Sequence, residues 1–82
     1  MKTTSAKFAI AYTNDDTGRR RVLGTESTRA DAVALRNKKV AGIARRLGME
    51  PNVEDAMVAT VRAGRGRHVE WNGHHFEILP VE

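Results

Sequence analysis

The side chains best suited to chemistry in this chain are its guanidinium and ammonium groups, which gather in short runs along the sequence. A guanidinium is a planar fork of N–H donors, so it can hold two oxygens of a phosphate or carboxylate group at once. Groups of such side chains are typical of surfaces that contact the phosphates of nucleic acid. The candidate contact residues are Arg19, Arg20, Arg21, Lys38, Lys39, Arg45, Arg46, Arg65 and Arg67.

The segment Arg65-Gly66-Arg67 is the sharpest local candidate. Glycine gives the backbone freedom, so the N–H groups here can form an anion nest while the two guanidiniums close over a phosphate. The competing interpretation is a polar loop that follows the end of a helix. Both interpretations predict an exposed segment, and both remain open at this point.

The other basic residues fall on expected strand and helix positions. Arg19–Arg21 follows a turn, where it either contacts a phosphate backbone or protects an exposed strand edge from pairing with other chains. The basic pairs at 38–39 and 45–46 are seven residues, or two helical turns, apart. This spacing predicts a basic stripe with Arg36 on its flank, which is either a phosphate-binding surface or an ordinary solvated face.

Histidines and carboxylates alternate in the last part of the chain. His68, Glu70, His75 and Glu77 are expected on one face of a hairpin, and these side chains are legitimate ligands for a divalent metal. Flat sheet faces rarely bring four ligands together tetrahedrally, whereas cross-strand Glu–His ion pairs account for the same residues. We therefore predict surface ion pairs here and no metal.

The residues that support catalysis are few. The chain has no cysteine, no serine in a nucleophile-elbow context and no phosphate-binding P-loop motif. His75 with Glu70 resembles a base with its orienting carboxylate, but no nucleophile accompanies the pair. We predict a protein that is not an enzyme and that has no cofactor.

The composition is that of one small, basic domain. The chain has 82 residues, 40% of them hydrophobic, no cysteine and a formal net charge of +4. Residues 1–41 contain nine Lys or Arg and four Asp or Glu, whereas residues 42–82 contain five and six. A chain of this length forms a single core, and without cysteine it has neither disulfides nor a thiolate metal site.

We predict a single domain over residues 7–82, preceded by a flexible N-terminus at residues 1–6. The apolar run Phe8–Tyr12 has five residues. It is too short for the core of a signal peptide, about 7–15 residues, or for a membrane span of about 20. Together with the lack of cysteine, this favours a cytoplasmic protein with no membrane partner.

The first half of the domain has the pattern of a hairpin followed by a helix. Residues 7–13 alternate with a period of two, residues 14–18 have turn composition, and residues 19–25 return as a strand with Gly24 as a candidate bulge. Thr28 followed by Asp31 has the form of a capping box, and Gly48 is the expected stop of that helix. Its predicted apolar stripe contains Val33, Val40, Ile43, Ala44 and Leu47.

The second half has the pattern of a helix followed by a hairpin. Asn52 is the expected N-cap of the helix and Gly64 its end, and Val53, Met57, Val58 and Val61 make its apolar side. Asn72-Gly73 predicts a two-residue type I′ turn, because both positions tolerate a positive φ. An apolar face is then expected, with His74 at its edge. The predicted opposite pairs are Trp71 with His74, Glu70 with His75, Val69 with Phe76, and His68 with Glu77.

The element order ββααββ predicts an α+β fold, a two-layer sandwich with a four-stranded antiparallel sheet and both helices on one face. The leading functional hypothesis is a non-catalytic binding domain, monomeric or homodimeric, whose basic surface contacts the phosphates of DNA or RNA. The alternative is a small protein-binding inhibitor or adaptor that blocks a larger host complex. Phages and mobile elements make small proteins of that kind, including anti-CRISPR-type proteins.

Overall fold

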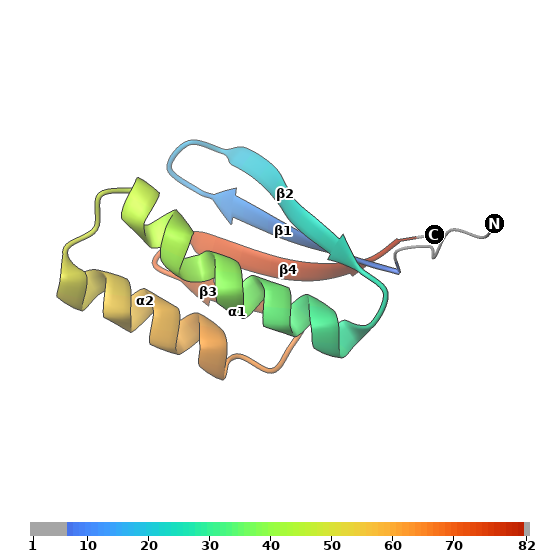
Figure 1. Ribbon diagram of the computed structural model, residues 1–82. Helices are drawn as coiled ribbons and strands as arrows, with labels where there is room; N and C mark the ends of the chain where they lie inside the picture. Colours follow the sequence, from blue (N-terminus) through green and yellow to red (C-terminus); the bar gives the residue numbers. More distant parts are fainter. Residues whose placement is uncertain (1–6, 82) are drawn as a thin grey trace.

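The computed structural model describes residues 7–81 and confirms the predicted α+β fold. The expected flexible N-terminus at residues 1–6 lies outside the described residues. The strands form one antiparallel sheet in the order β2-β1-β4-β3, and both helices lie on the same side of it (Figure 1). The elements are β1 (Phe8–Asn14), β2 (Arg19–Glu26), α1 (Arg29–Arg46), α2 (Pro51–Ala63), β3 (His68–Trp71) and β4 (His74–Pro80).

The first hairpin has the expected turn and a bulge beside the expected residue. Gly18 adopts a φ of +70° in the turn. The β1–β2 register shifts between Ile10 and Ala11, which pair with Gly24 and Val22, so the residue without a partner is Leu23. A Cβ on Gly24 would lie 2.6 Å from the Leu35 side chain, so the missing side chain there lets α1 approach β2 closely.

Helix α1 begins and ends as predicted, but its buried side differs. The Thr28 hydroxyl accepts a hydrogen bond from the Asp31 N–H at 3.1 Å, and Gly48 follows the helix with a φ of +73°. The predicted stripe is partly wrong because Val33 is only half-buried and Leu47 is exposed. The side of the helix that faces the sheet includes Arg36, a charged residue that the predicted apolar stripe did not contain. The buried residues are Ala32, Arg36, Val40, Ile43 and Ala44.

Helix α2 begins two residues earlier than predicted. Pro51 occupies its first turn and Glu50 is the N-cap, with no side-chain capping bond, so the prediction of Asn52 as N-cap is wrong. Proline suits this position because its fixed φ is helical and the N–H that it lacks would have no intrahelical partner. Met57 and Val61 are fully buried, and the helix ends at Gly64 as predicted.

The second hairpin has the predicted turn and register. Asn72 and Gly73 have φ values of +48° and +81°, as a type I′ turn requires. Strand β4 pairs with β3 on one side and with β1 on the other, so the two hairpins join through their inner strands. All four predicted opposite pairs are present, from Trp71 with His74 to His68 with Glu77.

The core lies between the sheet and the helices. Helix α1 packs over β1, β2 and β4, whereas α2 packs over β3. One apolar cluster contains Tyr12, Val40, Ile43, Ala44, Met57, Val61, Val69 and Phe76. A smaller one contains Ile10, Ala32 and Ile78. Within residues 7–81, neither helix is long and apolar enough to cross a membrane.

Candidate nucleic-acid interface

A groove of about 350 Å³ runs between the edge strand β2 and helix α1. Four of its lining residues carry a positive charge, and none of the described residues that line it is acidic. One of these cations comes from the first hairpin and three come from the helix, so the fold unites two basic runs that are separate in sequence. The lining residues are Arg21, Val22, Leu23, Lys38, Lys39, Gly42, Ile43 and Arg46. We call this the β2–α1 groove.

The sheet register explains why only one arginine of the Arg19–Arg21 run lines the groove. Arg21 pairs with Tyr12, a core residue on the helix side of the sheet, and directly opposite residues share a face. Arg20 pairs with Thr13 and so belongs to the opposite face of the sheet. Arg19 pairs with Asn14 at the start of the strand and is exposed, but it does not line the groove.

Gly42 leaves the helix side of the groove open. No heavy atom lies within 4 Å of the position that a Cβ would occupy there. Glycine inside a helix costs about 1 kcal/mol relative to alanine, and crowding does not require it at this position. The helix backbone at Gly42 is therefore accessible to a ligand bound in the groove.

Only part of the expected basic stripe on α1 lines the β2–α1 groove, because Arg45 forms an ion pair and Arg36 is buried. Arg45 forms an ion pair with Glu54 of α2, with Nε and Oε2 3.3 Å apart, so it turns away from its neighbour Arg46. Arg36, predicted on the flank of the stripe, is instead fully buried. That prediction is wrong because α1 sits directly over the sheet, and Arg36 lies on the side of the helix that faces the core.

A second groove of about 470 Å³ lies where α1 begins and α2 ends. Arg65 lines it, whereas Arg67 is exposed and lines neither groove, so the two guanidiniums of the predicted nest do not converge. The Arg67 carbonyl accepts a hydrogen bond from the Ile78 N–H at 2.7 Å, which ties this loop to β4. The lining residues are Arg29, Val33, Arg62, Ala63, Gly64 and Arg65. We call this the α1–α2 groove.

Sequence reasoning missed Arg29 and Arg62 as site residues. A signal was present for the first of them, because Arg29 and Arg36 are seven residues apart and therefore lie on one side of α1. For Arg62 no such signal exists. Its place in the groove follows from the packing of α2 beside α1.

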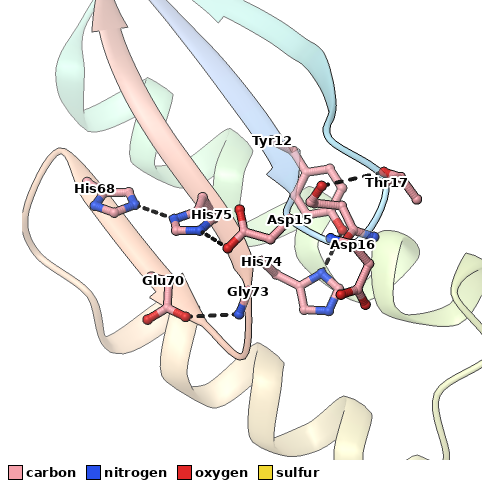
Figure 2. Close-up of polar contacts among 10 residues, drawn as sticks. Tyr12, Asp15, Asp16, Thr17, His68, Glu70, Gly73, His74 and His75 are labelled. Carbon is pink, nitrogen blue, oxygen red and sulfur yellow. Dashed lines mark hydrogen bonds and ion pairs between the residues drawn. The ribbon is translucent and has the colours of Figure 1, made fainter.

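His68 of β3 and His75 of β4 form a chain with Asp15 (Figure 2). His68 Nε2 lies 2.8 Å from His75 Nδ1, and His75 Nε2 lies 3.0 Å from Asp15 Oδ2. The predicted Glu–His ion pairs are wrong, since His75 pairs with Asp15, while Glu70 accepts a hydrogen bond from the Gly73 N–H. The cause is the bond from the Asp15 N–H to the Gly73 carbonyl, which brings the two hairpin turns together.

Within residues 7–81, no group of three or more His, Asp or Glu side chains is arranged to hold a metal ion. His74, expected at the edge of the apolar face, is buried and its Nδ1 lies 2.7 Å from the Tyr12 hydroxyl. Its ring stacks with those of Tyr12 and Trp71. Burial raises the pKa of Tyr12, so its hydroxyl stays protonated and joins β1 to β4.

Replacement of Asp15 by asparagine should lower the pKa of His75 and reduce stability at acidic pH only. The hydrogen bond to Asp15 raises the pKa of His75 above 6.5, with smaller contributions from the charges of Asp15, Glu70 and Glu77. Because the folded-state pKa is raised, protonated His75 stabilises the fold below pH 6.5, and this stabilisation disappears as pH rises through the raised pKa.

An NMR titration of the His75 ring protons, with urea unfolding at about pH 5.5 and about pH 8.5, measures both effects. Asp16→Asn in the same turn is the matched control and should change neither. An equal loss of stability from Asp15→Asn at both pH values would contradict the expected linkage.

The structure thus offers two basic grooves on the two flanks of α1 and a polar histidine chain on the sheet. Among the residues 7–81, the recorded ion pairs are those of Arg45 and His75, so the cations that line the grooves are in none of them. Comparisons of the chain with models of known protein families, with curated proteins and with solved structures give no match.

Proposed function

We propose that this protein is a non-catalytic binding domain that contacts the phosphate backbone of nucleic acid through the β2–α1 groove. The observation that carries this proposal is the meeting of Arg21 from β2 with Lys38, Lys39 and Arg46 from α1 around one open groove. These cations have no carboxylate neighbour among the residues that line it. A row of phosphates supplies the complementary charge.

The lining also favours one mode of contact. No aromatic side chain lines the β2–α1 groove, so it lacks the platform on which bases of a single strand stack. Tyr12 and Phe76 are buried in the core instead. The groove therefore suits the sugar-phosphate backbone of a duplex, with affinity from charge and little dependence on sequence.

Fluorescence anisotropy of labelled duplex DNA, single-stranded DNA and RNA, each at several salt concentrations, tests the proposal. Four phosphate contacts give a slope of log K against log salt of about −3 to −4 on duplex DNA. We expect a slope in that range and no preference for single strands. Binding that hardly changes with salt, or no binding at low salt, would contradict the proposal.

A second candidate function, a protein-binding inhibitor or adaptor, is favoured by the edge of the sheet. Strand β2 is an outer strand, and its Val22 is 60% exposed. Outer strands can accept a strand of another protein, and exposed apolar residues add to such a contact. In this case the groove cations meet acidic side chains of the partner. A protein that binds no nucleic acid at low salt would favour this candidate.

A further inference from the structure

Four arginines meet around the α1–α2 groove, and every hydrogen bond recorded for their side chains goes to a neutral oxygen. Arg29 Nη2 donates to the Arg65 carbonyl at 2.8 Å, and Arg62 Nε donates to the Asn37 carbonyl at 3.2 Å. Arg36 Nη2 donates to the Gly64 carbonyl at 2.9 Å and, with Nε, to the side-chain oxygen of Asn37. We call these residues, Arg29, Arg36, Arg62 and Arg65, the arginine cluster.

No member of the arginine cluster belongs to either ion pair recorded for residues 7–81. Arg29, Arg62 and Arg65 line the groove and are exposed. Arg36 does not line it, but its side chain donates a hydrogen bond to the carbonyl of Gly64, which does. Like charges this close repel one another. The protein therefore holds several positive charges together at this place, and no carboxylate is among the described residues that line the groove.

The buried guanidinium of Arg36 is a second, independent sign of uncompensated positive charge at this place. Its side chain is fully buried, and Nη1 has no hydrogen-bond partner within the described part of the chain. Burial, with the charge of Arg29, lowers the pKa of its guanidinium, although an arginine remains charged at any physiological pH. Charged groups in protein interiors are normally paired, because an unpaired buried charge loses its hydration without compensation.

We propose that the α1–α2 groove is an anion site that binds a phosphate group. Arg29, Arg62 and Arg65 are the contacting residues, and Arg36 is a positioning residue whose bond to Gly64 holds the loop that carries Arg65. A phosphate fits better than a carboxylate because it carries up to two charges and presents several oxygens to the planar forks of arginine.

NMR of the labelled protein, titrated with sodium phosphate and then with sodium chloride at matched ionic strength, tests this site. We expect saturable shifts with phosphate at the amides of Gly64 and Arg65 and at the Nε–H of Arg36, with chloride producing little change. Arg29→Gln and Arg62→Gln, both at exposed positions, should each weaken phosphate binding at least about tenfold, as loss of one charge-assisted contact does.

The control is Arg20→Gln, which removes one exposed charge outside both grooves and should leave phosphate binding unchanged. Shifts that chloride reproduces, or equal binding by wild type and both arginine variants, would overturn the proposal. Neither result depends on whether the protein binds nucleic acid through the β2–α1 groove.

The double variant Lys38→Glu, Lys39→Glu shows whether the phosphate group comes from a nucleic acid or from a small molecule, because it removes the positive charge of two lining residues of the β2–α1 groove. If a 5′-phosphorylated oligonucleotide shifts Gly64 and Arg65 in this variant and its 5′-hydroxyl counterpart does not, the site takes a nucleic-acid terminus. If only pyrophosphate does so, the site takes a small molecule. Both results support a phosphate site, whereas no shift with phosphate, pyrophosphate or oligonucleotide rejects it.

Discussion

The double variant Lys38→Glu, Lys39→Glu is expected to bind duplex DNA at least about 50-fold more weakly than wild type at 0.1 M salt. Each phosphate contact contributes about 0.9 decade of affinity for every tenfold drop in salt below 1 M, so two lost contacts remove close to two decades. The slope of log K against log salt should fall by about 2. Fluorescence anisotropy at several salt concentrations measures both quantities.

The matched control reverses two charges outside both grooves. Arg20 and Arg67 are exposed and line neither groove, so Arg20→Glu, Arg67→Glu changes the net charge equally without altering the proposed surface. We expect this control to bind within a few-fold of wild type. If the two double variants lose affinity equally, binding follows net charge alone and the β2–α1 groove is not the contact surface.

An uncharged variant separates the shape of the groove from its charge. Gly42→Leu places a side chain in the open space beside the C-terminal part of α1 and leaves all four cations in place. Replacing glycine inside the helix should also stabilise it by about 0.5–1 kcal/mol. A more stable protein with weaker binding would therefore identify the groove as the surface that the ligand enters.

The largest expected effect on stability is that of Phe76→Ala. Phe76 is fully buried on the inner strand β4, and its ring contacts that of Tyr12 at a centroid distance of 5.1 Å. Truncation of a buried phenylalanine costs about 3–5 kcal/mol. A domain of this size has a total stability of about 4–12 kcal/mol, so the variant should lose a large part of it.

Urea unfolding followed by fluorescence of Trp71, the only tryptophan, measures this loss. The matched control is Val22→Ala, because Val22 is a 60% exposed apolar residue of the same sheet and should change stability by less than about 0.5 kcal/mol. A Phe76→Ala protein that unfolds at nearly the wild-type urea concentration would show that the core does not depend on the contact between β1 and β4.

The two grooves have one structural origin, which is the position of α1 over the middle of the sheet. One flank of the helix faces the edge strand β2, and the other faces α2. Leu35 reaches Gly24 on the first flank, and Arg62 reaches Asn37 on the second. A single element thus contributes cations to both proposed sites.

Features set by local chemistry were predictable from the sequence. The Thr28 cap needs only its own hydroxyl and the N–H of Asp31 three residues later. Asn72-Gly73 specifies its turn through the φ values that those two residues tolerate, and the turn then sets the register of the whole β3–β4 hairpin. The order of elements, and with it the two-layer fold, follows from signals of this kind.

The start of α2 shows where local reasoning becomes ambiguous. Asn52 and Pro51 are adjacent, and each is a favourable residue for a helix start at a different position. Asparagine caps the helix by a side-chain bond, whereas proline fits inside the first turn. The structure uses the proline, so the capping signal of Asn52 is not used and Glu50 becomes the N-cap.

The sequence by itself determined which residues are cations and which elements carry them, because composition and periodicity are properties of the chain alone. Only the tertiary structure decided which cations meet. Arg21 joins Lys38 because β2 lies beside α1, Arg45 leaves them for an ion pair with α2, and Arg36 is buried because its side of the helix faces the sheet. These outcomes depend on packing between segments that are distant in sequence, and the residue pattern of one segment does not specify that packing.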